Sequence, residues 1–264
     1  MTLIATFLTL FPESLRSVVD ASILGRAQKA GVLQVGSIDM REFSTNKHRT
    51  VDDSPAGGGA GMVLRVDVVV PAIRAALRRH PEAARPRVIL LDARGPVFTQ
   101  ADARRLARMD HLVFVCGRYE GIDARAEASV DEVLSIGDYV LTGGELPALV
   151  VLDAVARMLP GVLGNEESAL HESHADEALL EHRQYTRPVE FEGASVPPVL
   201  LAGNHKAIAD ARRKDALLMT RQRRPDLFVR RNRARADDKL LMDADLPSLD
   251  PVHSTTTDSQ RHGA

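Results

Sequence analysis

The chain has 264 residues, of which 44% are hydrophobic and 27% charged, and its formal net charge is −2 at pH 7. This balance excludes a disordered or collagen-like chain and is typical of a globular protein long enough to bury a sizeable core. The single cysteine, Cys116, cannot form an internal disulfide, and no run approaches the roughly 20 apolar residues of a membrane helix. We therefore expect a soluble, cytoplasmic protein that does not contact a membrane.

Strand and helix patterns alternate over the first 160 residues. The apolar run at residues 2–11 has no Lys or Arg before it, which favours a first strand over a signal peptide. Short aliphatic runs predict buried strands at 3–10, 88–91 and 112–116. Helical spacing is found at 68–79, 100–108 and 145–159. Such alternation predicts an α/β fold in which helices cover a parallel sheet.

Charge is distributed unevenly along the second half of the chain. Residues 164–182 contain six acids and no Lys or Arg, whereas residues 206–235 contain eleven basic residues and three acids. Either run is compatible with a solvated surface. A concentrated basic segment in a near-neutral protein nevertheless favours a local anionic partner, and nucleic acid is the first candidate.

These features predict four parts of the chain. Residues 1–163 form the α/β domain, and residues 164–182 form an acidic linker that is long for a connection within a compact domain. Residues 183–235 form a basic helical domain, with helices over 204–220 and from 222 onward. Residues 236–264 lack apolar periodicity and are expected to be disordered.

Three glycine-containing segments are candidates for ligand binding. Residues 57–61 lack the strand–turn–helix context of a dinucleotide site, and a surface loop is the alternative. Residues 116–123 and 135–145 follow strands, and ligands of open α/β sheets bind at the carboxyl ends of strands. Their glycines, acids and tyrosines suit a purine nucleoside with a cationic group better than a triphosphate, and plain tight turns are the alternative.

The sequence does not indicate metal or thiol chemistry. His171, His174 and His182 lie near carboxylates, but their spacing matches no tight ligand pattern, so no metal site is expected. Cys116 ends an apolar run, which is typical of a buried small hydrophobic residue and not of a catalytic thiol.

Taken together, the motifs resemble those of the bacterial tRNA (guanine-N1)-methyltransferases, which act at position 37 of tRNA beside the anticodon. The matching stretches follow the family's order along residues 1 to about 230. They are Leu10–Glu13, His48–Asp53, Gly57–Met62, Val115–Asp123, Ser135–Pro147, Pro160–Gly164, Gln184–Pro188 and Val196–His205.

The resemblance implies a SPOUT-type catalytic domain, whose parallel sheet contains a deep trefoil knot, followed by a smaller helical C-terminal domain. It implies a homodimer whose active sites lie between the subunits, with S-adenosylmethionine as the methyl donor. The C-terminal domain would bind the anticodon stem-loop of tRNA. The resemblance also allows a requirement for magnesium.

Functional residues are carried over by their position in these motifs. Tyr119 resembles a stacking partner near the target base, and Arg157 resembles the arginine that stabilises charge on guanine O6. In the donor site, Glu120 would face the methionine ammonium. The donor site as a whole would comprise Leu90, Leu91, Gly117, Glu120, Ile136, Gly137, Asp138, Tyr139, Val140, Leu141, Gly143, Gly144 and Pro147. Phosphate contacts are expected among Arg212, Arg213 and Lys214.

The family's general base is a linker aspartate followed by serine, and the matching pair here is Glu172 and Ser173. Guanine N1 carries a proton, which a carboxylate must remove as the bond to the methyl group forms. Asp176, four residues further on, is the rival base. The linker is expected to become ordered only when tRNA binds, because it has few large apolar groups.

Several positions depart from the family pattern. Asp92-Ala93 stands where Ser-Pro is usual, Ala60 replaces a proline, Ala211 replaces a tryptophan, and Glu172 replaces the aspartate. These departures leave open a homologue that binds tRNA or donor with weak turnover. An unrelated nucleotide-dependent α/β enzyme is the third hypothesis.

Overall fold

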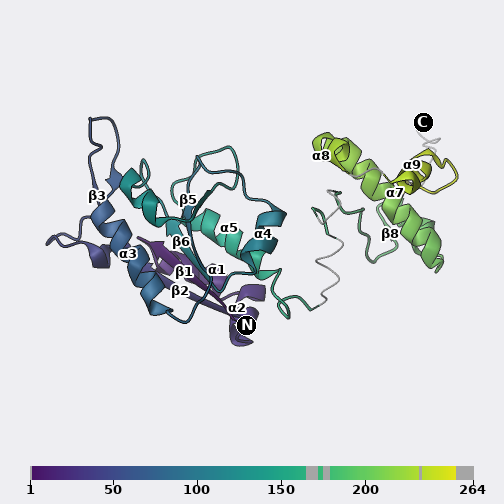
Figure 1. Cartoon of the computed structure of the whole chain (residues 1–264). Coiled ribbons are helices and arrows are strands. Elements are labelled where there is room, and N and C mark those ends of the chain that lie inside the picture. Colours follow the sequence, from purple (N-terminus) through teal and green to yellow (C-terminus); the bar gives the residue numbers. More distant parts are fainter. Residues whose placement is uncertain (1, 165–171, 175–178, 232–233, 254–264) are drawn as a thin grey trace, which may run out of the picture. The chain divides into compact units, whose positions relative to one another are not determined.

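The computed structural model describes residues 2–164, 172–174, 179–231 and 234–253. The chain divides into two compact units, residues 1–166 and 167–264 (Figure 1). The first unit contains the alternating strands and helices, and the second contains the basic helices. No helix in the described ranges is long and apolar enough to cross a membrane.

A five-stranded parallel sheet forms the centre of the first unit, with the strand order β2-β1-β6-β5-β7. In chain order the strands are β1 Leu3–Thr9, β2 Leu33–Asp39, β5 Pro86–Leu91, β6 His111–Cys116 and β7 Glu132–Leu134. The three strands predicted from aliphatic runs are the three central ones, and every residue of β6 is buried. The sequence pattern missed β2 and β7, because β2 is an edge strand with several polar residues and β7 has only three residues.

Helices cover both faces of this sheet, which confirms the α/β fold (Figure 1). Neighbouring residues of β1 point to opposite faces, so that Phe7 and Leu8 belong to two different apolar clusters. The Phe7 side packs against α1 Glu13–Val19, α2 Ser22–Lys29, α4 Gln100–Leu106 and α5 Glu145–Ala156. The Leu8 side packs against α3 Val66–Arg79 and the 3-10 helices Met40–Phe43 and Ala124–Ser129. A sheet buried on both faces needs continuous apolar strands, as β5 and β6 have.

A short hairpin carries the glycine segment 57–61. Strands β3 Asp52–Asp53 and β4 Val63–Leu64 pair antiparallel, and the glycines lie in the loop between them. Four of these residues, Gly57, Gly58, Gly59 and Gly61, have positive φ angles, which explains why the loop is made of glycine.

The second unit is built around a long helix. It contains α7 His205–Arg223, α8 Pro225–Arg230, α9 Arg235–Met242 and a 3-10 helix at Pro198–Leu200. Strands β8 Glu190–Phe191, β9 Ala194–Ser195 and β10 Val252–His253 form a small antiparallel sheet. The Asn204 side chain accepts a hydrogen bond from the Ala207 N–H and caps α7. Pro225 starts α8 at the position where α7 has ended.

Part of the C-terminal segment folds onto α7, although its composition predicts disorder from residue 236. The Arg213 guanidinium pairs with the buried carboxylate of Asp237 at 2.9 Å. The Lys214 ammonium donates to the backbone carbonyls of Asp243 and Leu246 at 2.5 and 2.9 Å. Leu249 is 1% exposed and packs with Val199 and Ala211. Single anchoring residues of this kind produce no apolar periodicity in the sequence. Residues 254–264 lie outside the described part of the chain.

Candidate functional site

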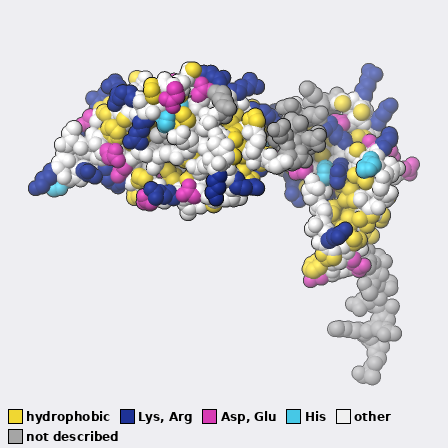
Figure 2. Space-filling view, turned by 90° about the horizontal axis from the view of Figure 1, so that it is seen from below, with side chains coloured by type: hydrophobic (Ala, Val, Ile, Leu, Met, Phe, Trp, Pro, Cys, Tyr) yellow, Lys and Arg dark blue, Asp and Glu magenta, His cyan; other side chains and the backbone are white. Residues whose placement is uncertain are grey.

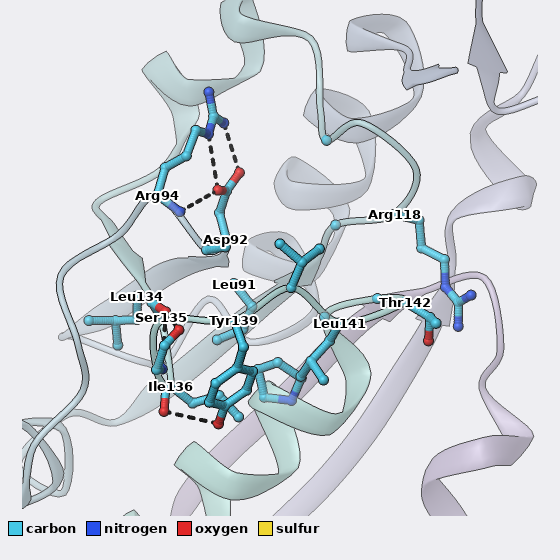
Figure 3. A pocket seen from close by; sticks show the side chains of 18 of the residues that line it. Leu91, Asp92, Arg94, Arg118, Leu134, Ser135, Ile136, Tyr139, Leu141 and Thr142 are labelled. Carbon is cyan, nitrogen blue, oxygen red and sulfur yellow. Dashed lines mark hydrogen bonds and ion pairs between the residues drawn. The ribbon is translucent and has the colours of Figure 1, made fainter. Parts of the chain in front are cut away.

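A pocket of about 250 Å³ lies at the carboxyl ends of β5, β6 and β7 (Figure 3). Its walls are three loops that follow these strands, at residues 91–94, 117–121 and 134–144, and its floor includes Pro147 of α5. This is the edge of an open parallel sheet at which ligands bind. Two of the three glycine-containing segments singled out in the sequence, 116–123 and 135–145, are therefore brought together in one site.

The pocket loops are bonded to one another through their backbones. Val97 bridges Ser135, and Arg118 bridges Gly143. The Phe98 N–H donates to the Ser135 carbonyl at 2.8 Å, and the Gly144 N–H donates to the Gly117 carbonyl at 2.8 Å. These bonds fix the walls of the pocket relative to one another.

Glycine is required where the loops touch. An added Cβ on Gly144 would lie 2.7 Å from Cys116 Cα and 2.9 Å from Gly117 N, which are backbone atoms of the neighbouring wall. Gly137 has a φ of 155° and lies under the ring of Tyr139, whose hydroxyl donates to the Ile136 carbonyl at 3.2 Å (Figure 3). These glycines let the backbones of neighbouring loops approach closely, and this close approach sets the separation of the pocket walls.

Two carboxylates line the pocket. The Asp92 carboxylate accepts from Arg94 Nε at 3.0 Å and from an Arg94 terminal nitrogen at 2.7 Å (Figure 3). This ion pair lowers the pKa of Asp92 below its usual value, against the opposing effect of burial. The second carboxylate, Glu120, packs against Gly61 of the hairpin loop, and its backbone N–H donates to the Met62 carbonyl at 3.0 Å. The glycine loop is therefore a neighbour of the pocket.

Arg118 connects the pocket to the end of β1. Its guanidinium lies over the Phe11 ring, 4.3 Å from the ring centroid, and 3.4 Å from the buried carboxylate of Glu145. Glu145 also accepts from the Thr9 hydroxyl at 2.7 Å. This arrangement anchors the first turn of α5 beside the pocket.

Most of the residues carried over for the donor site line this pocket. They are Leu91, Gly117, Glu120, Ile136, Gly137, Tyr139, Val140, Leu141, Gly143, Gly144 and Pro147. Leu90 does not line it, because it points into the core and is 1% exposed, and Asp138 is also not among the lining residues. Tyr119 lines the pocket, is 53% exposed and has a φ of 59°, a conformation that non-glycine residues rarely adopt and that is frequent at functional sites.

Asp92, Arg94 and Thr142 also line the pocket but were not among the predicted donor residues; Asp92 was noted only as a departure from the family pattern. The signal available for Asp92 was its position directly after a buried strand, at the same sheet edge as the glycine segments. Arg94 forms part of the pocket wall because its side chain pairs with Asp92. The spacing of residue types along the sequence does not predict this pairing.

Arg157 lies at the opposite end of α5 from the pocket. It caps the C-terminus of the helix, ten residues after Pro147, which corresponds to about 15 Å along the axis. On the outer side of the same helix, Leu146 is 61% and Val150 is 48% exposed. Leu146, Val150 and Arg157 follow the i, i+4, i+11 spacing of one helix face.

The remaining predicted residues belong to the second unit. Glu172 is partly exposed there, whereas its rival Asp176 lies outside the described residues, as does His171. On α7, Arg212 is exposed, whereas Arg213 and Lys214 bind the C-terminal segment as described above.

No group of three or more His, Cys, Asp or Glu able to hold a metal ion is found within the described residues. Cys116 is completely buried, and this burial raises the pKa of its thiol well above the ordinary value. A thiol in this state is not a nucleophile.

Comparison with protein families matches residues 3–230 to the family described as tRNA (Guanine-1)-methyltransferase TrmD. The chain is 54% identical over 235 residues to a tRNA (guanine-N(1)-)-methyltransferase of Myxococcus xanthus, which covers 89% of this chain and 94% of the relative. It is 52% identical over 240 residues to the protein of the same name from Heliobacterium modesticaldum, covering 90% of this chain and 88% of the relative. A relative of the same name from Anaeromyxobacter sp. (strain K) is 53% identical over 235 residues, covering 89% and 94%.

Replacing Gly144 by alanine should weaken binding of S-adenosylmethionine, because the added Cβ would collide with backbone atoms on the opposite wall. Overpacking of this kind costs about 1–3 kcal/mol, and a cost of that size in the bound state raises the dissociation constant about 5- to 150-fold in calorimetric titration. Gly36→Ala is the matched control, since a Cβ there meets nothing within 4 Å. Equal affinities for Gly144→Ala and the parent protein would contradict the assignment of this pocket.

Proposed function

The chain belongs to the tRNA (guanine-1)-methyltransferase family, and from this premise we propose that it transfers a methyl group from S-adenosylmethionine to N1 of the guanine at position 37 of tRNA, next to the anticodon. Membership of the family excludes the unrelated nucleotide-dependent enzyme. The observation that carries the proposal is the pocket at one edge of the parallel sheet, which is lined by most of the carried-over donor residues.

The chemistry of the pocket fits this donor. The backbone of the loop at 135–144 borders the pocket, which suits the polar edge of adenine, and Leu91 and Ile136 offer an apolar surface for its ring. The carboxylate of Glu120 suits the methionine ammonium. When bound, S-adenosylmethionine supplies a methyl group that is activated by a positively charged sulfur.

The protein's own residues then have two tasks at the guanine. The Glu172 carboxylate takes the proton from guanine N1, which is otherwise a poor nucleophile. The negative charge that develops spreads to O6, where a fixed arginine donor such as Arg157 is worth several kcal/mol. Tyr119, exposed at the pocket rim, is suited to stack near the target base.

We infer a homodimer because Arg157 does not line the donor pocket of its own unit. Arg157 is about 15 Å along α5 from the pocket floor, on the face that exposes Leu146 and Val150. An exposed apolar face of this kind favours an interface. Pairing α5 with its copy would bring Arg157 of one subunit toward the pocket of the other, so that the active site lies between subunits. We also propose that the parallel sheet of the first unit contains the deep trefoil knot that the resemblance implies.

The second unit would bind the anticodon stem-loop mainly through phosphates. Lys and Arg side chains project from its surface (Figure 2). Among the three consecutive cations of α7, Arg212 is the exposed one, whereas Arg213 and Lys214 bind the C-terminal segment. We therefore assign the phosphate contact to Arg212.

Action on tRNA would place the protein in the cytoplasm. The requirement for magnesium that the resemblance allows stays a prediction.

Methyl transfer to defined tRNA transcripts, measured in single turnover, tests the function and the base together. We expect methylation of guanine N1 at position 37, a loss of about 100-fold or more in Glu172→Gln, and little change in Asp176→Asn. Glu172→Asp tests whether the extra methylene of glutamate displaces the base.

Absence of the product from the parent protein would favour the weakly active homologue over the enzyme proposed above. A loss confined to Asp176→Asn would assign the base to Asp176. A Glu172→Asp variant faster than the parent would show that this protein works with a displaced carboxylate.

Mixing two inactive variants tests the shared active site. Suppose that each active site takes Arg157 from one chain and Glu172 from the other. A heterodimer of Arg157→Ala and Glu172→Ala subunits then has one intact site and one site that lacks both residues. We expect about half of the parental activity per dimer. If both residues came from the same chain, each site would lack one of them and the heterodimer would be inactive.

Replacing Arg212 and Arg213 separately distinguishes binding from structure. Arg212→Ala should weaken tRNA binding and reduce the slope of log affinity against log salt by about 0.7–0.9, the value for one phosphate contact, with an unchanged melting temperature. Arg213→Ala should instead lower the melting temperature, because it leaves the buried Asp237 carboxylate without its partner. An unchanged salt slope in Arg212→Ala would contradict the assignment.

A further inference from the structure

The segment 179–185 is bonded to buried polar side chains of α7. The Leu180 N–H donates to Thr220 Oγ1 at 2.9 Å, and the Thr220 hydroxyl donates to the Ala216 carbonyl at 2.7 Å. Five residues earlier on α7, the Asp215 carboxylate accepts from the Arg183 N–H at 2.8 Å and from Arg183 Nε at 3.0 Å. Thr220 is 0% and Asp215 is 1% exposed. These buried contacts fix the backbone of the segment relative to α7.

The proposed base is attached to the same segment. The Ser173 hydroxyl oxygen accepts from the Glu181 N–H at 2.9 Å, and the His174 N–H donates to the Leu179 carbonyl at 3.0 Å. Leu179 is itself buried, at 8% exposure. Glu172 directly precedes Ser173, so its position follows that of residues 179–181 and, through them, that of α7.

We propose that Thr220 is a positioning residue for methyl transfer, which acts through Leu180, Glu181 and Ser173 to set the location of the Glu172 carboxylate. Asp215, with Arg183, supports the same segment on the preceding turns of α7. This inference rests on the proposed function, in which Glu172 is the base and α7 binds tRNA. When tRNA binds to α7, the hydrogen bonds that hold residues 179–185 to α7 would also set the position of the Glu172 carboxylate.

The physical reason is that a general base works only within hydrogen-bond reach of the proton it removes. A displacement of about 1 Å costs on the order of 100-fold in rate. Without the Thr220 hydroxyl, the Leu180 N–H loses its acceptor, and the segment loses the bond to α7 that lies nearest to Glu181 and Ser173. The first unit, which contains the donor pocket, makes none of these bonds, so donor binding should not depend on them.

Thr220→Val and Thr220→Ser in the full-length protein test the proposal. Valine keeps the shape and removes the acceptor, whereas serine keeps the acceptor. At saturating tRNA and S-adenosylmethionine, we expect the single-turnover rate of Thr220→Val to fall about 10- to 100-fold. The rate of Thr220→Ser should stay within about twofold of the parent, and the donor dissociation constant should be unchanged in both. Ser173→Ala, at a partly exposed position, should reproduce the loss without a risk to folding.

Combination with Glu172→Gln identifies the route of the effect. If Thr220 acts through Glu172, Thr220→Val should cause no further loss in the Glu172→Gln background. A further loss of the same size there, or a parental rate for both Thr220→Val and Ser173→Ala, would overturn the positioning role. A parental rate in Glu172→Gln alone would overturn the base assignment itself, so the two failures are distinguishable.

Discussion

The backbone of Gly144 lies against the backbone of Cys116 and Gly117, and the pocket depends on this contact. The Gly144 N–H donates to the Gly117 carbonyl at 2.8 Å, at a separation that leaves no room for a Cβ. The contact joins the end of β6 to the start of α5, so the loop that precedes the helix must close over the ends of β5 and β7. No side chain caps α5; the N–H of its cap residue, Gly144, is bonded to the neighbouring loop instead. Because Gly144 and Gly117 lie so close together, the three loops meet around one pocket.

The second unit shows why a count of charges is a weak guide to a binding surface. Its basic segment predicts a nucleic-acid partner, yet Arg183 and Arg213 are paired with the buried acids Asp215 and Asp237. A buried carboxylate needs such a partner, because the free energy of leaving it unpaired is several kcal/mol. Only cations that remain exposed, such as Arg212, are left for phosphates. A basic segment can therefore hold its own domain together as well as contact RNA.

The small residue at position 211 connects a departure from the family pattern with the fold of the C-terminal segment. Ala211 is 1% exposed and packs with Val199 and Leu249, where the family usually has tryptophan. An alanine leaves the space that Leu249 fills, and the Arg213 and Lys214 contacts hold the intervening chain. A residue that the sequence shows only as a departure from the family pattern therefore takes part in packing in the structure.

The sequence by itself determined the parts whose signal is local. Continuous aliphatic runs predicted β1, β5 and β6, because a sheet covered on both faces buries every residue of its central strands, and motifs of several residues identified the family. Periodicity could not find β7, which has three residues and is a strand only because it pairs with β5. Only the tertiary structure placed Leu90 in the core and Leu91 in the pocket, paired Asp92 with Arg94, and separated Arg157 from the pocket by the length of α5. These features depend on contacts between residues far apart in the chain or on which face of an element a side chain occupies, and neither is encoded in the spacing of residue types.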